Sequence, residues 1–411
     1  MVSGNFKGAI ADIASYVSYF QVTMKAIQQA KQGFNDFLNF QKDLTNISYT
    51  MNLSPDQLQN LGTSAIDMAK DLSMSLDNTM DIYKIYANMN TTASEIQQTA
   101  RPTAILSNLS GVDASTAADQ VQGILQQFHM LEDGSTTAAD ASMHIVDVLD
   151  KVSGSVGIDY AKGIKIISDA VQASGQVAYD AGMSYEQLAA ITAKVSERTR
   201  EDGSSIGNAL KTIITRTTKV GKMPQYADEV DNAALSNASA SLHAIGVDVY
   251  NPDGSDRGII TVMSELKDKW DDLTDAQQAK ISYDVAATRQ TSKFKSMLDA
   301  FTDSMSLAEE ATTANGNAEA NQEKYMESTA GKLQAIKTQM QDFWVNFYNS
   351  GTVNGVLEFV HSLTEGFTSL EKTLGPIPAL LTAVFAAMTV KNATMAGLKF
   401  LSGGGLATVV G

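Results

Sequence analysis

The chain has 411 residues, with 6 Pro, no Cys, 4 His and a formal net charge of −16. This acidic excess argues against specific nucleic-acid binding, which needs a basic face. Without cysteine there can be no disulfide framework, thiolate zinc site, iron–sulfur cluster or cysteine nucleophile. No proline falls between Pro102 and Pro224, and so long a stretch without helix breakers favours a mostly helical protein.

We therefore predict an all-α fold, in which short capped helices form a multi-helix globular core. One small β-hairpin is expected near 246–260, and long heptad-patterned helices are expected at both ends. A chain of this length suggests two or three domains. The predicted segments are an N-terminal heptad-patterned helix (1–50), a helical core (51–232), a connector with the β-hairpin and helices (233–318), long amphipathic helices (319–374) and an apolar C-terminal segment (375–411).

The first of these segments carries apolar residues at alternating spacings of three and four, which is typical of a heptad seam. Lys31 and Gln41 occupy two seam positions, where polar residues select register at a cost in stability. The pattern fits a coiled coil between copies of the chain, and it also fits one amphipathic helix on a globular core. The predicted oligomer seam consists of Ile10, Ile13, Val17, Phe20, Met24, Ile27, Phe34 and Leu38.

Helix starts recur through the middle of the chain. A Ser or Thr followed three residues later by Glu or Gln is a capping box, which satisfies the free amide groups at a helix N-terminus. Asp113 and Thr116, after Gly111, offer a further start. The core is therefore predicted to consist of helices of ordinary length joined by tight turns. The predicted capping boxes are Ser54–Gln57, Thr92–Glu95, Ser184–Gln187 and Thr274–Gln277.

Residues 246–260 break the helical pattern. Gly246 to Tyr250 alternates apolar and polar residues, Asn251 to Asp256 is rich in turn formers, and Arg257 to Ile260 returns. This pattern predicts a β-hairpin. The turn begins like a calcium loop, but its twelfth position is Val262 where a Glu is required, so we predict a plain turn. Before it, 233–244 is small and polar, and we expect a flexible connector.

Near the C-terminus a second seam comprises Leu333, Ile336, Met340, Phe343 and Phe347, preceded by Met326 and Thr329 in the same spacing. Gly351 follows as a helix stop signal. A third seam runs through Val356, Val360, Leu363, Phe367, Leu370 and Leu374. Two long helices with a short glycine-containing joint imply either an antiparallel pair or a bent extended arm.

The last apolar stretch, 377–390, has no charge over fourteen residues, which is short of the ~20 needed to span a bilayer. It fits a buried helix, and it also fits an interfacial or truncated membrane segment. Under the second interpretation the predicted membrane contacts are Leu380, Leu381, Val384 and Phe385. The N-terminus lacks the apolar stretch of a secretory signal, and we expect the chain to be a fragment of a longer one.

Residue patterns that would support catalysis do not assemble. The histidines are spread along the chain, so we predict no metal site and no cofactor. Gly203 to Gly207 formally fits a GxSxG elbow around Ser205, but it follows a predicted helix rather than a strand, and we expect a glycine-rich turn between helices. A basic cluster is expected to be a solvated helix face or a contact for an acidic partner. We predict no enzymatic activity; that cluster comprises Lys194, Arg198, Arg200, Lys211, Arg216 and Lys219.

Several patterns in order resemble the core region of tape-measure proteins of long-tailed phages. The nearest stretches are Ala181-Gly-Met-Ser-Tyr-Glu-Gln-Leu188 and Gly203-Ser-Ser-Ile-Gly-Asn-Ala-Leu210. Leu242 to Tyr250 and Ser328-Thr-Ala-Gly-Lys-Leu333 are also similar. The resemblance covers about residues 34–350. One departure is that the family often has Phe-Gly-x-Arg where this chain reads Asp284-Val-Ala-Ala-Thr-Arg289.

The resemblance implies a virion structural protein that fills the tail tube, helps set tail length and leaves at infection to assist DNA delivery. Its implied location is the tail lumen, after assembly in the host cytoplasm. Implied partners are further copies of itself, the tail tube protein, tail-tip and baseplate proteins, tail assembly chaperones and, for some members, the host membrane. The alternative is a membrane-active delivery or pore module that acts through the apolar C-terminal segment.

Overall fold

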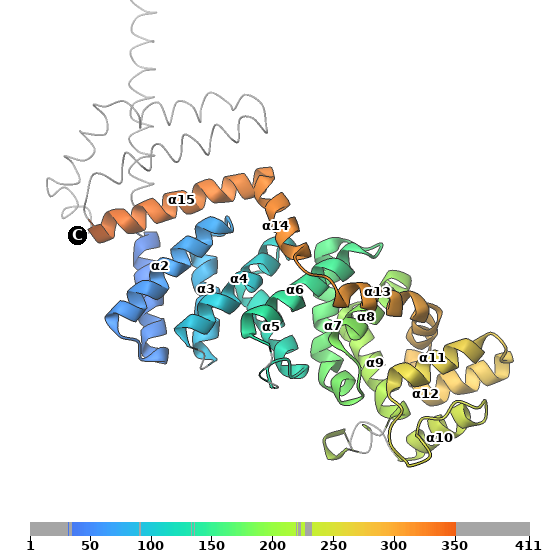
Figure 1. Ribbon diagram of the computed structural model, residues 1–411. Coiled ribbons are helices and arrows are strands. Elements are labelled where there is room, and N and C mark those ends of the chain that lie inside the picture. Colours follow the sequence, from blue (N-terminus) through green and yellow to red (C-terminus); the bar gives the residue numbers. More distant parts are fainter. Residues whose placement is uncertain are drawn as a thin grey trace, which may run out of the picture. The chain divides into compact units, whose positions relative to one another are not determined.

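The computed structural model confirms the all-α prediction, because helices dominate and no sheet forms among the residues it describes (Figure 1). The chain divides into two compact units, one of Met1–Lys84 with Lys324–Gly411 and one of Ile85–Glu323. The five predicted segments stay a prediction. The described residues are 32, 35–89, 92–132, 134, 136–218, 220, 223–226 and 232–350.

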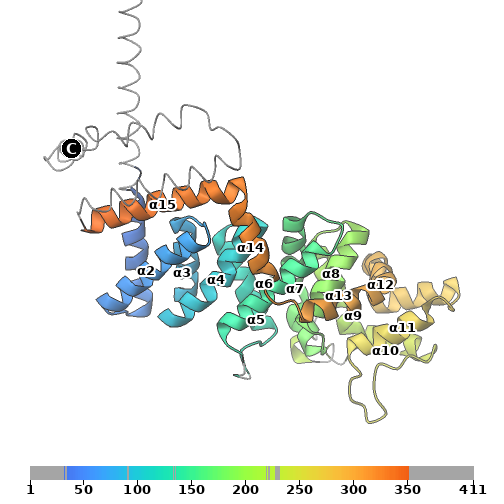
Figure 2. The same ribbon diagram turned by 45° about the horizontal axis from the view of Figure 1, so that its top comes forward.

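The first unit contains the helical residues 35–51, α2 (Pro55–Asp71), the start of α3 (Leu76–Asn88) and α15 (Thr329–Ser350). Helix 35–51 buries Phe40, Leu44 and Ile47. It comes close to α2 because Gly62 has no side chain there, and an added Cβ would lie 3.0 Å from a Leu44 methyl carbon. Figure 2 shows α15 beside α2, with which it makes contacts.

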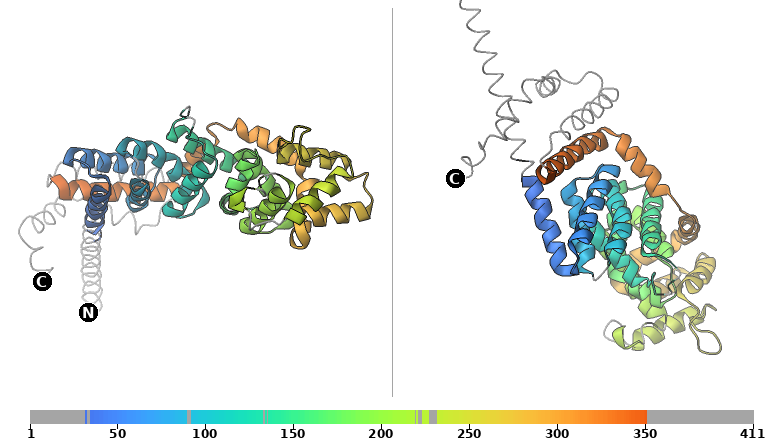
Figure 3. Two further views of the ribbon diagram at one scale, coloured as in Figure 1. Left: turned by 90° about the horizontal axis from the view of Figure 1, so that it is seen from below. Right: turned by 60° about the vertical axis from the view of Figure 1, so that its left-hand side comes forward.

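The second unit is built around α7, which packs against its neighbours on both sides in sequence (Figure 3). The later helices α12 and α13 return to pack against α9 and α8 respectively. Helix α14 (Asn317–Glu327) leads out of this unit. The remaining elements are α4 (Ala93–Ser110), α5 (Ala114–Gln127), α6 (Ala138–Gly154), α7 (Tyr160–Asp180), α8 (Tyr185–Thr199), α9 (Gly203–Thr217), η2 (Pro224–Tyr226), α10 (Asn232–His243), α11 (Ile259–Trp270), α12 (Asp275–Asp299) and α13 (Phe301–Thr312).

The predicted helix starts are confirmed. Ser54, Thr92, Ser184 and Thr274 each accept a bond from the third residue of the helix, and the side chain at that residue bonds back in every case. Asp113 is the N-cap of α5 and accepts a bond from the Thr116 amide at 2.9 Å. Because these boxes involve only neighbouring residues, sequence spacing is sufficient to find them.

The expected flexible connector at 233–244 is wrong, because α10 occupies it. Leu235, Ala238 and Leu242 are buried, and their spacing of three and four places them on one helix face. Alanine is the strongest helix former, so a small and polar segment folds as a helix once it has a surface to pack on. Helices α9 and α12 provide that surface.

The β-hairpin prediction is wrong in its extent. A single antiparallel bridge joins Tyr250 to Asp256, and the Arg257 amide donates to the Val249 carbonyl at 3.3 Å. Gly258 has a φ of 76° and turns the chain directly into α11, so Ile259 and the residue after it are helical rather than a return strand. The loop itself is a turn, as predicted, closed by a bond from the Asn251 amide to the Ser255 carbonyl at 2.9 Å.

Helix α12 is kinked at Ala287, whose backbone has φ 56° and ψ 171°. This conformation belongs almost entirely to glycine and costs another residue on the order of 1–3 kcal/mol. Ala287 stands two residues before Arg289, as glycine does in the Phe-Gly-x-Arg pattern of the resembling family. The residue that stands in place of the family's glycine therefore has a strained backbone conformation.

Two buried carboxylates on α6 hold the start of α14. Asp147 accepts bonds from the backbone amides of Gly316 at 2.9 Å and Ala318 at 2.8 Å. Asp150 accepts from the side-chain amide of Asn321, with 2.9 Å to each oxygen. Burial is the largest influence on Asp147 and raises its pKa despite these bonds. Asp147 therefore acts as a helix cap supplied by a different helix.

Candidate functional site

The α7–α8 turn carries the Ala-Gly-Met-Ser-Tyr-Glu stretch of the resemblance. Gly182 has a φ of 75°, a value that glycine adopts without strain. The turn closes when the Met183 amide donates to the Ala178 carbonyl at 2.9 Å. Ser184 then caps α8, and both Met183 and Tyr185 are buried. The motif thus sets a tight turn and supplies two large core side chains.

An open apolar hollow lies beside this turn, where residues after α5 approach it. The Phe128 ring meets Tyr179 edge to face at 6.3 Å and Tyr185 at 5.7 Å between ring centroids. The Tyr185 hydroxyl donates to the Ile145 carbonyl at 3.3 Å, and burial raises the Tyr185 pKa. The lining residues are Phe128, Met130, Tyr179, Gly182, Met183, Ser184, Tyr185 and Glu186.

Two histidine–glutamate pairs flank the hollow. His129 lies 2.5 Å from Glu132 and stacks on Tyr179 at 4.6 Å between centroids, and the hydrogen bond to Glu132 raises the His129 pKa. His144 lies 2.6 Å from Glu186. Burial opposes ionisation of Glu186, but bonds from His144 and Ser184 outweigh it and lower its pKa. Each of these two histidines therefore has a carboxylate partner.

The prediction of a glycine-rich turn between helices at Gly203 to Gly207 is wrong. These residues form the first turn of α9. Asp202 precedes it as the N-cap and accepts from the Ser205 amide at 2.8 Å. The two glycines face α7 at backbone distance: a Cβ on Gly203 would lie 2.0 Å from the Ile166 carbonyl oxygen, and one on Gly207 would lie 2.7 Å from that of Ala170. The pair therefore allows close packing of α9 on α7.

The described residues of the predicted basic cluster lie on α8, at its end and on α9, and several of them have partners within the chain. Arg200 donates to the Gly157 carbonyl at 2.9 Å, and Arg216 donates to the Asp284 carbonyl at 3.2 Å. Lys194 pairs with Glu197 at 3.2 Å. Arg200 and Arg216 therefore fix segments that are separate in sequence to one another, whereas the Lys194 pair lies within α8. Lys219 lies outside the described residues.

A buried cation was missed by the sequence patterns. Lys293 is 7% exposed and lies 2.8 Å from a Glu201 carboxylate oxygen. Burial opposes ionisation of Glu201, but the bonds from Lys293 and Ser205 lower its pKa. The pair joins α12 to the connection between α8 and α9. Since its members lie far apart in sequence, no local spacing could have indicated it.

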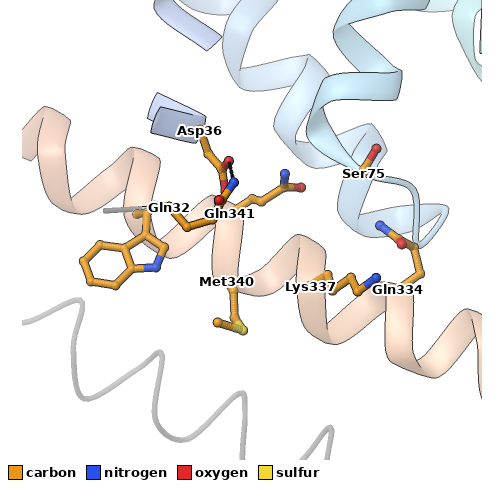
Figure 4. Close-up of a pocket in the computed structure, with 8 residues that line it drawn as sticks. Gln32, Asp36, Ser75, Gln334, Lys337, Met340 and Gln341 are labelled. Atoms are coloured by element: carbon orange, nitrogen blue, oxygen red, sulfur yellow. Dashed lines mark hydrogen bonds between the residues drawn. The ribbon is translucent and has the colours of Figure 1, made fainter. Parts of the chain in front are cut away.

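In the first unit, α15 is fixed to the turn between α2 and α3. The Thr338 hydroxyl donates to the Met74 carbonyl at 2.6 Å, and the Gln341 side-chain oxygen accepts from the Leu76 amide at 3.0 Å. Asp342 pairs with Lys70 at 3.2 Å. A pocket opens beside this contact (Figure 4), lined by Gln32, Asp36, Ser75, Gln334, Lys337, Met340, Gln341 and Trp344.

The predicted oligomer seam lies almost wholly outside the described residues, which begin at residue 32. Of its members only Leu38 is described, and it is 47% exposed. The buried stripe of helix 35–51 runs instead through Phe40, Leu44 and Ile47. Contacts inside the chain therefore use a different face from the one that holds Leu38. Its role in an oligomer stays a prediction.

The second seam lies on α15, which begins at Thr329. Met326 belongs to α14, which ends at Glu327, so it is not on the same helix as the rest of the seam. Ile336 is buried and Leu333 is 45% exposed. Met340 lines the pocket beside the α2–α3 turn. The side chains of Phe343 and Phe347 lie outside what the structure describes.

The third seam and the predicted membrane contacts at Leu380, Leu381, Val384 and Phe385 also lie outside the described residues. Within the part of the chain that is described, no helix has the length and apolar character to cross a bilayer. The same part contains no group of three or more His, Asp or Glu side chains placed to hold a metal ion.

Comparison with known proteins gives one family. The family whose description is phage-related minor tail protein matches residues 62–287, more than half of the 411 residues. The matched range runs from Gly62 in α2 to the kink at Ala287 in α12, and it includes both the Met183 turn and the Gly203–Gly207 pair. No solved structure matches the chain.

Proposed function

We propose, because the chain belongs to the phage-related minor tail protein family, that it is a tail tape-measure protein. In this role it fills the tail tube, helps to set the length of the tail and leaves at infection to assist DNA delivery. Its partners would be further copies of the chain, the tail tube protein, tail-tip and baseplate proteins, and tail assembly chaperones. Its place would be the lumen of the virion tail.

The observation that carries this proposal is the use of the motif residues for packing. Met183 and Tyr185 fill the core beside the α7–α8 turn, while Gly203 and Gly207 let α9 touch α7. These four residues thus contribute to the packing of a helical body, which supports a structural role. A helix also reports length linearly, at about 1.5 Å per residue, so long helical segments suit a ruler.

The ruler role is tested by changing the length of a helical segment in the phage gene. Deletion of residues 10–37, which is four heptads, is expected to shorten the tail by about 42 Å if the segment is helical. Duplication of the same residues should lengthen the tail by the same amount. Tail lengths are measured on purified virions by electron microscopy.

A variant of unchanged length, Gly123→Ala, controls for effects of mutation alone and should give tails of normal length. The duplication keeps the test informative when the deletion blocks assembly. Tails of normal length from virions that carry either altered chain would contradict a ruler role for this segment.

We further propose that the role is non-enzymatic, as the packing function of the motif residues favours. Clearing of bacterial cell walls by the purified chain would contradict this. It would place the protein among muralytic tail components instead.

The second candidate is a membrane-active delivery module, favoured by the charge-free residues 377–390. In this case the chain should release dye from liposomes, and Val384→Lys should abolish the release because a charge is costly in the apolar layer. Leu266→Lys is not a suitable control, since Leu266 is buried in the core. Ala279→Lys, at an exposed position of α12, introduces the same charge and should leave release unchanged. Absence of any lipid binding would exclude this candidate.

A further inference from the structure

The joint between α13 and α14 contains the dipeptide Asn315-Gly316. Asn315 is exposed and lies outside both helices. Gly316 has a φ of 76°, a value that glycine adopts without strain, so the turn into α14 itself favours glycine at this position. The fold therefore places a glycine directly after an exposed asparagine.

An asparagine followed by glycine can undergo a reaction within the chain. The backbone nitrogen of Gly316 attacks the side-chain carbonyl carbon of Asn315, a C–N bond forms and the attacking nitrogen gives up its proton. The side-chain nitrogen takes up a proton and leaves as ammonia, so that the product is a five-membered succinimide. Water then opens the ring at either carbonyl and gives aspartate or isoaspartate. Glycine has no side chain that would hinder the attack, and water is the one other reactant.

In the folded chain a buried carboxylate holds the attacking nitrogen. Asp147 on α6 is 2% exposed, and it accepts bonds from the Gly316 amide at 2.9 Å and from the Ala318 amide at 2.8 Å. Hydrogen bonds to a charged acceptor are among the stronger ones in proteins. The Gly316 amide has to leave this bond before its nitrogen can turn toward the Asn315 side chain.

The other contacts at the start of α14 are mostly polar. Within α14, Ala318 and Gln322 are buried. The Gln322 side-chain oxygen accepts from the Asn108 side-chain amide at 3.3 Å, and Glu319 lies 3.6 Å from Arg101 in a half-exposed ion pair. Exposed ion pairs contribute little to stability, and elements with few buried apolar contacts open locally before the whole unit unfolds. The start of α14 is therefore an element that can open by itself.

We propose that Asn315-Gly316 is a deamidation site controlled by Asp147. The reaction is slow while Asp147 caps α14, and it proceeds when the start of α14 opens. A modified Asn315 thus marks a chain in which this joint has opened. This inference goes beyond the proposed role in the tail and does not depend on it.

The products of the reaction weaken the same cap. Aspartate at position 315 adds a negative charge one residue before the amide that the Asp147 carboxylate binds, and like charges at short range repel. Isoaspartate instead adds one carbon atom to the backbone directly before Gly316, which displaces that amide from Asp147. Neither product returns to asparagine in water, since the ammonia has left. The change is therefore one-way, and it favours the open joint.

The rate of deamidation is measured on the purified full chain in a mildly alkaline buffer, with and without urea. Replacement of the side-chain NH2 group by OH changes the mass of the tryptic peptide 296–324, and fragmentation of this peptide locates the change at Asn315. The folded chain should react about ten times more slowly than the unfolded one, or slower still, because the bond to Asp147 must open first. Asn317, in the same peptide but followed by alanine, is the internal reference and should react far more slowly in both conditions.

Substitutions of Asp147 test the control in the folded chain. Asp147→Ala should raise the rate at Asn315 about fivefold or more, because the Gly316 amide loses a charged acceptor. The matched control Asp119→Ala, at an exposed position of α5, should leave the rate unchanged. Asp147→Asn keeps the size of the side chain and one acceptor oxygen, so its rate should lie between those of the parent and Asp147→Ala, and it keeps the test informative when Asp147→Ala does not fold. Circular dichroism confirms that each variant keeps its helices.

Four results would overturn the proposal. Absence of deamidation at Asn315 in urea would show that the dipeptide is not a reactive site. Equal rates in the folded and unfolded chain would show that the fold gives no protection. Rates unchanged in both Asp147 variants would assign the protection to another contact. A lower rate in folded Asp147→Ala would show that the carboxylate promotes the reaction by accepting the Gly316 proton.

Discussion

Helices α7 and α9 meet at backbone distance, whereas α15 meets the α2–α3 turn through polar side chains. In the first contact, Gly203 and Gly207 leave no room for even one added carbon atom. In the second, Thr338 and Gln341 reach across to backbone groups. Both contacts join segments that are not adjacent in sequence, but the first depends on the absence of a side chain and the second on the presence of polar side chains. They should therefore respond to opposite kinds of substitution.

The largest effect is expected from Gly203→Ala, because the new Cβ would lie 2.0 Å from a backbone oxygen that cannot rotate away. Overpacking of this kind should lower the free energy of unfolding by about 3 kcal/mol. The measurement is urea denaturation followed by circular dichroism. Gly123→Ala is the matched control, since Gly123 lies within α5 with nothing within 4 Å of an added Cβ. It should stabilise by about 0.5–1 kcal/mol, and equal stability of the two variants would contradict the backbone contact.

Asp147→Ala tests a polar contact inside the same unit as the glycine pair. The amides of Gly316 and Ala318 lose their acceptor, and the loss should cost about 2.5 kcal/mol because the lost bonds involve a charged group. Hydrogen exchange at these two amides should accelerate. Asp119→Ala, an exposed position on α5, should change stability by less than about 0.5 kcal/mol. Unchanged exchange at Gly316 would mean that Asp147 does not cap α14.

Thr338→Val removes the hydroxyl from the α15 contact and keeps the shape of the side chain. The Met74 carbonyl then lacks its donor, at a cost of about 1.5 kcal/mol, and hydrogen exchange along α15 should rise. Thr45→Val removes an exposed bond to the Gln41 carbonyl within helix 35–51, and it should have little effect. If Thr45→Val lowered the free energy of unfolding strongly and Thr338→Val did not, the Thr338 bond would not stabilise the position of α15.

Ala287→Gly should stabilise the second unit by about 1 kcal/mol, since glycine adopts the kinked backbone conformation without strain. Ala286→Gly is the neighbouring control: Ala286 is buried and outside the kink, so this change should destabilise. Thermal unfolding of the two variants and of the parent chain shows whether each substitution raises or lowers stability. Destabilisation by Ala287→Gly would show that the kink is not strained.

The smallest effect is expected from His129→Asn, in which asparagine tolerates the left-handed backbone found at this residue. The pKa of His129 is raised in the folded state by its bond to Glu132. Its contribution is therefore complete below the ordinary histidine pKa of about 6.5 and is lost as pH rises through the folded value. The stability difference between parent and variant should be greater at pH 5.5 than at pH 8, about one unit or more on either side of that pKa. A stability difference that grows as pH rises would contradict this expectation. Added salt should reduce the stability difference at pH 5.5.

Local signals predicted local structure well. The capping residues Ser54, Thr92, Ser184 and Thr274 could be found because a capping box needs only four consecutive residues. The small and polar composition of 233–244 indicates a connector, and the segment is instead a helix that packs against α9 and α12. The single bridge at Tyr250 shows the same limit, since the alternating pattern does not reveal where the next helix begins.

The site depended more on distant partners. The sequence shows the spacing of Gly203 and Gly207. It does not show that both glycines pack against α7, because no residue near Gly203 in sequence indicates which helix will lie there. Likewise, a carboxylate such as Asp147 looks like an ordinary helix residue until the chain returns at Gly316. The heptad spacing indicates a second seam on α15, but the spacing alone does not show that Ile336 is buried while Leu333 is 45% exposed.

The glycine contact between α7 and α9 also has a mechanical consequence. Attraction between touching atoms weakens by a quarter to a half when a gap of about 0.5–1 Å opens. A contact made by backbone atoms has no long side chains that could stretch to follow such a displacement. Under a pulling force it should resist with little extension and then break abruptly, whereas the flexible side chains of Gln341 and Lys70 on the α15 contact should yield gradually. Force spectroscopy would therefore record a stiff, brittle 85–323 unit and a compliant attachment of α15.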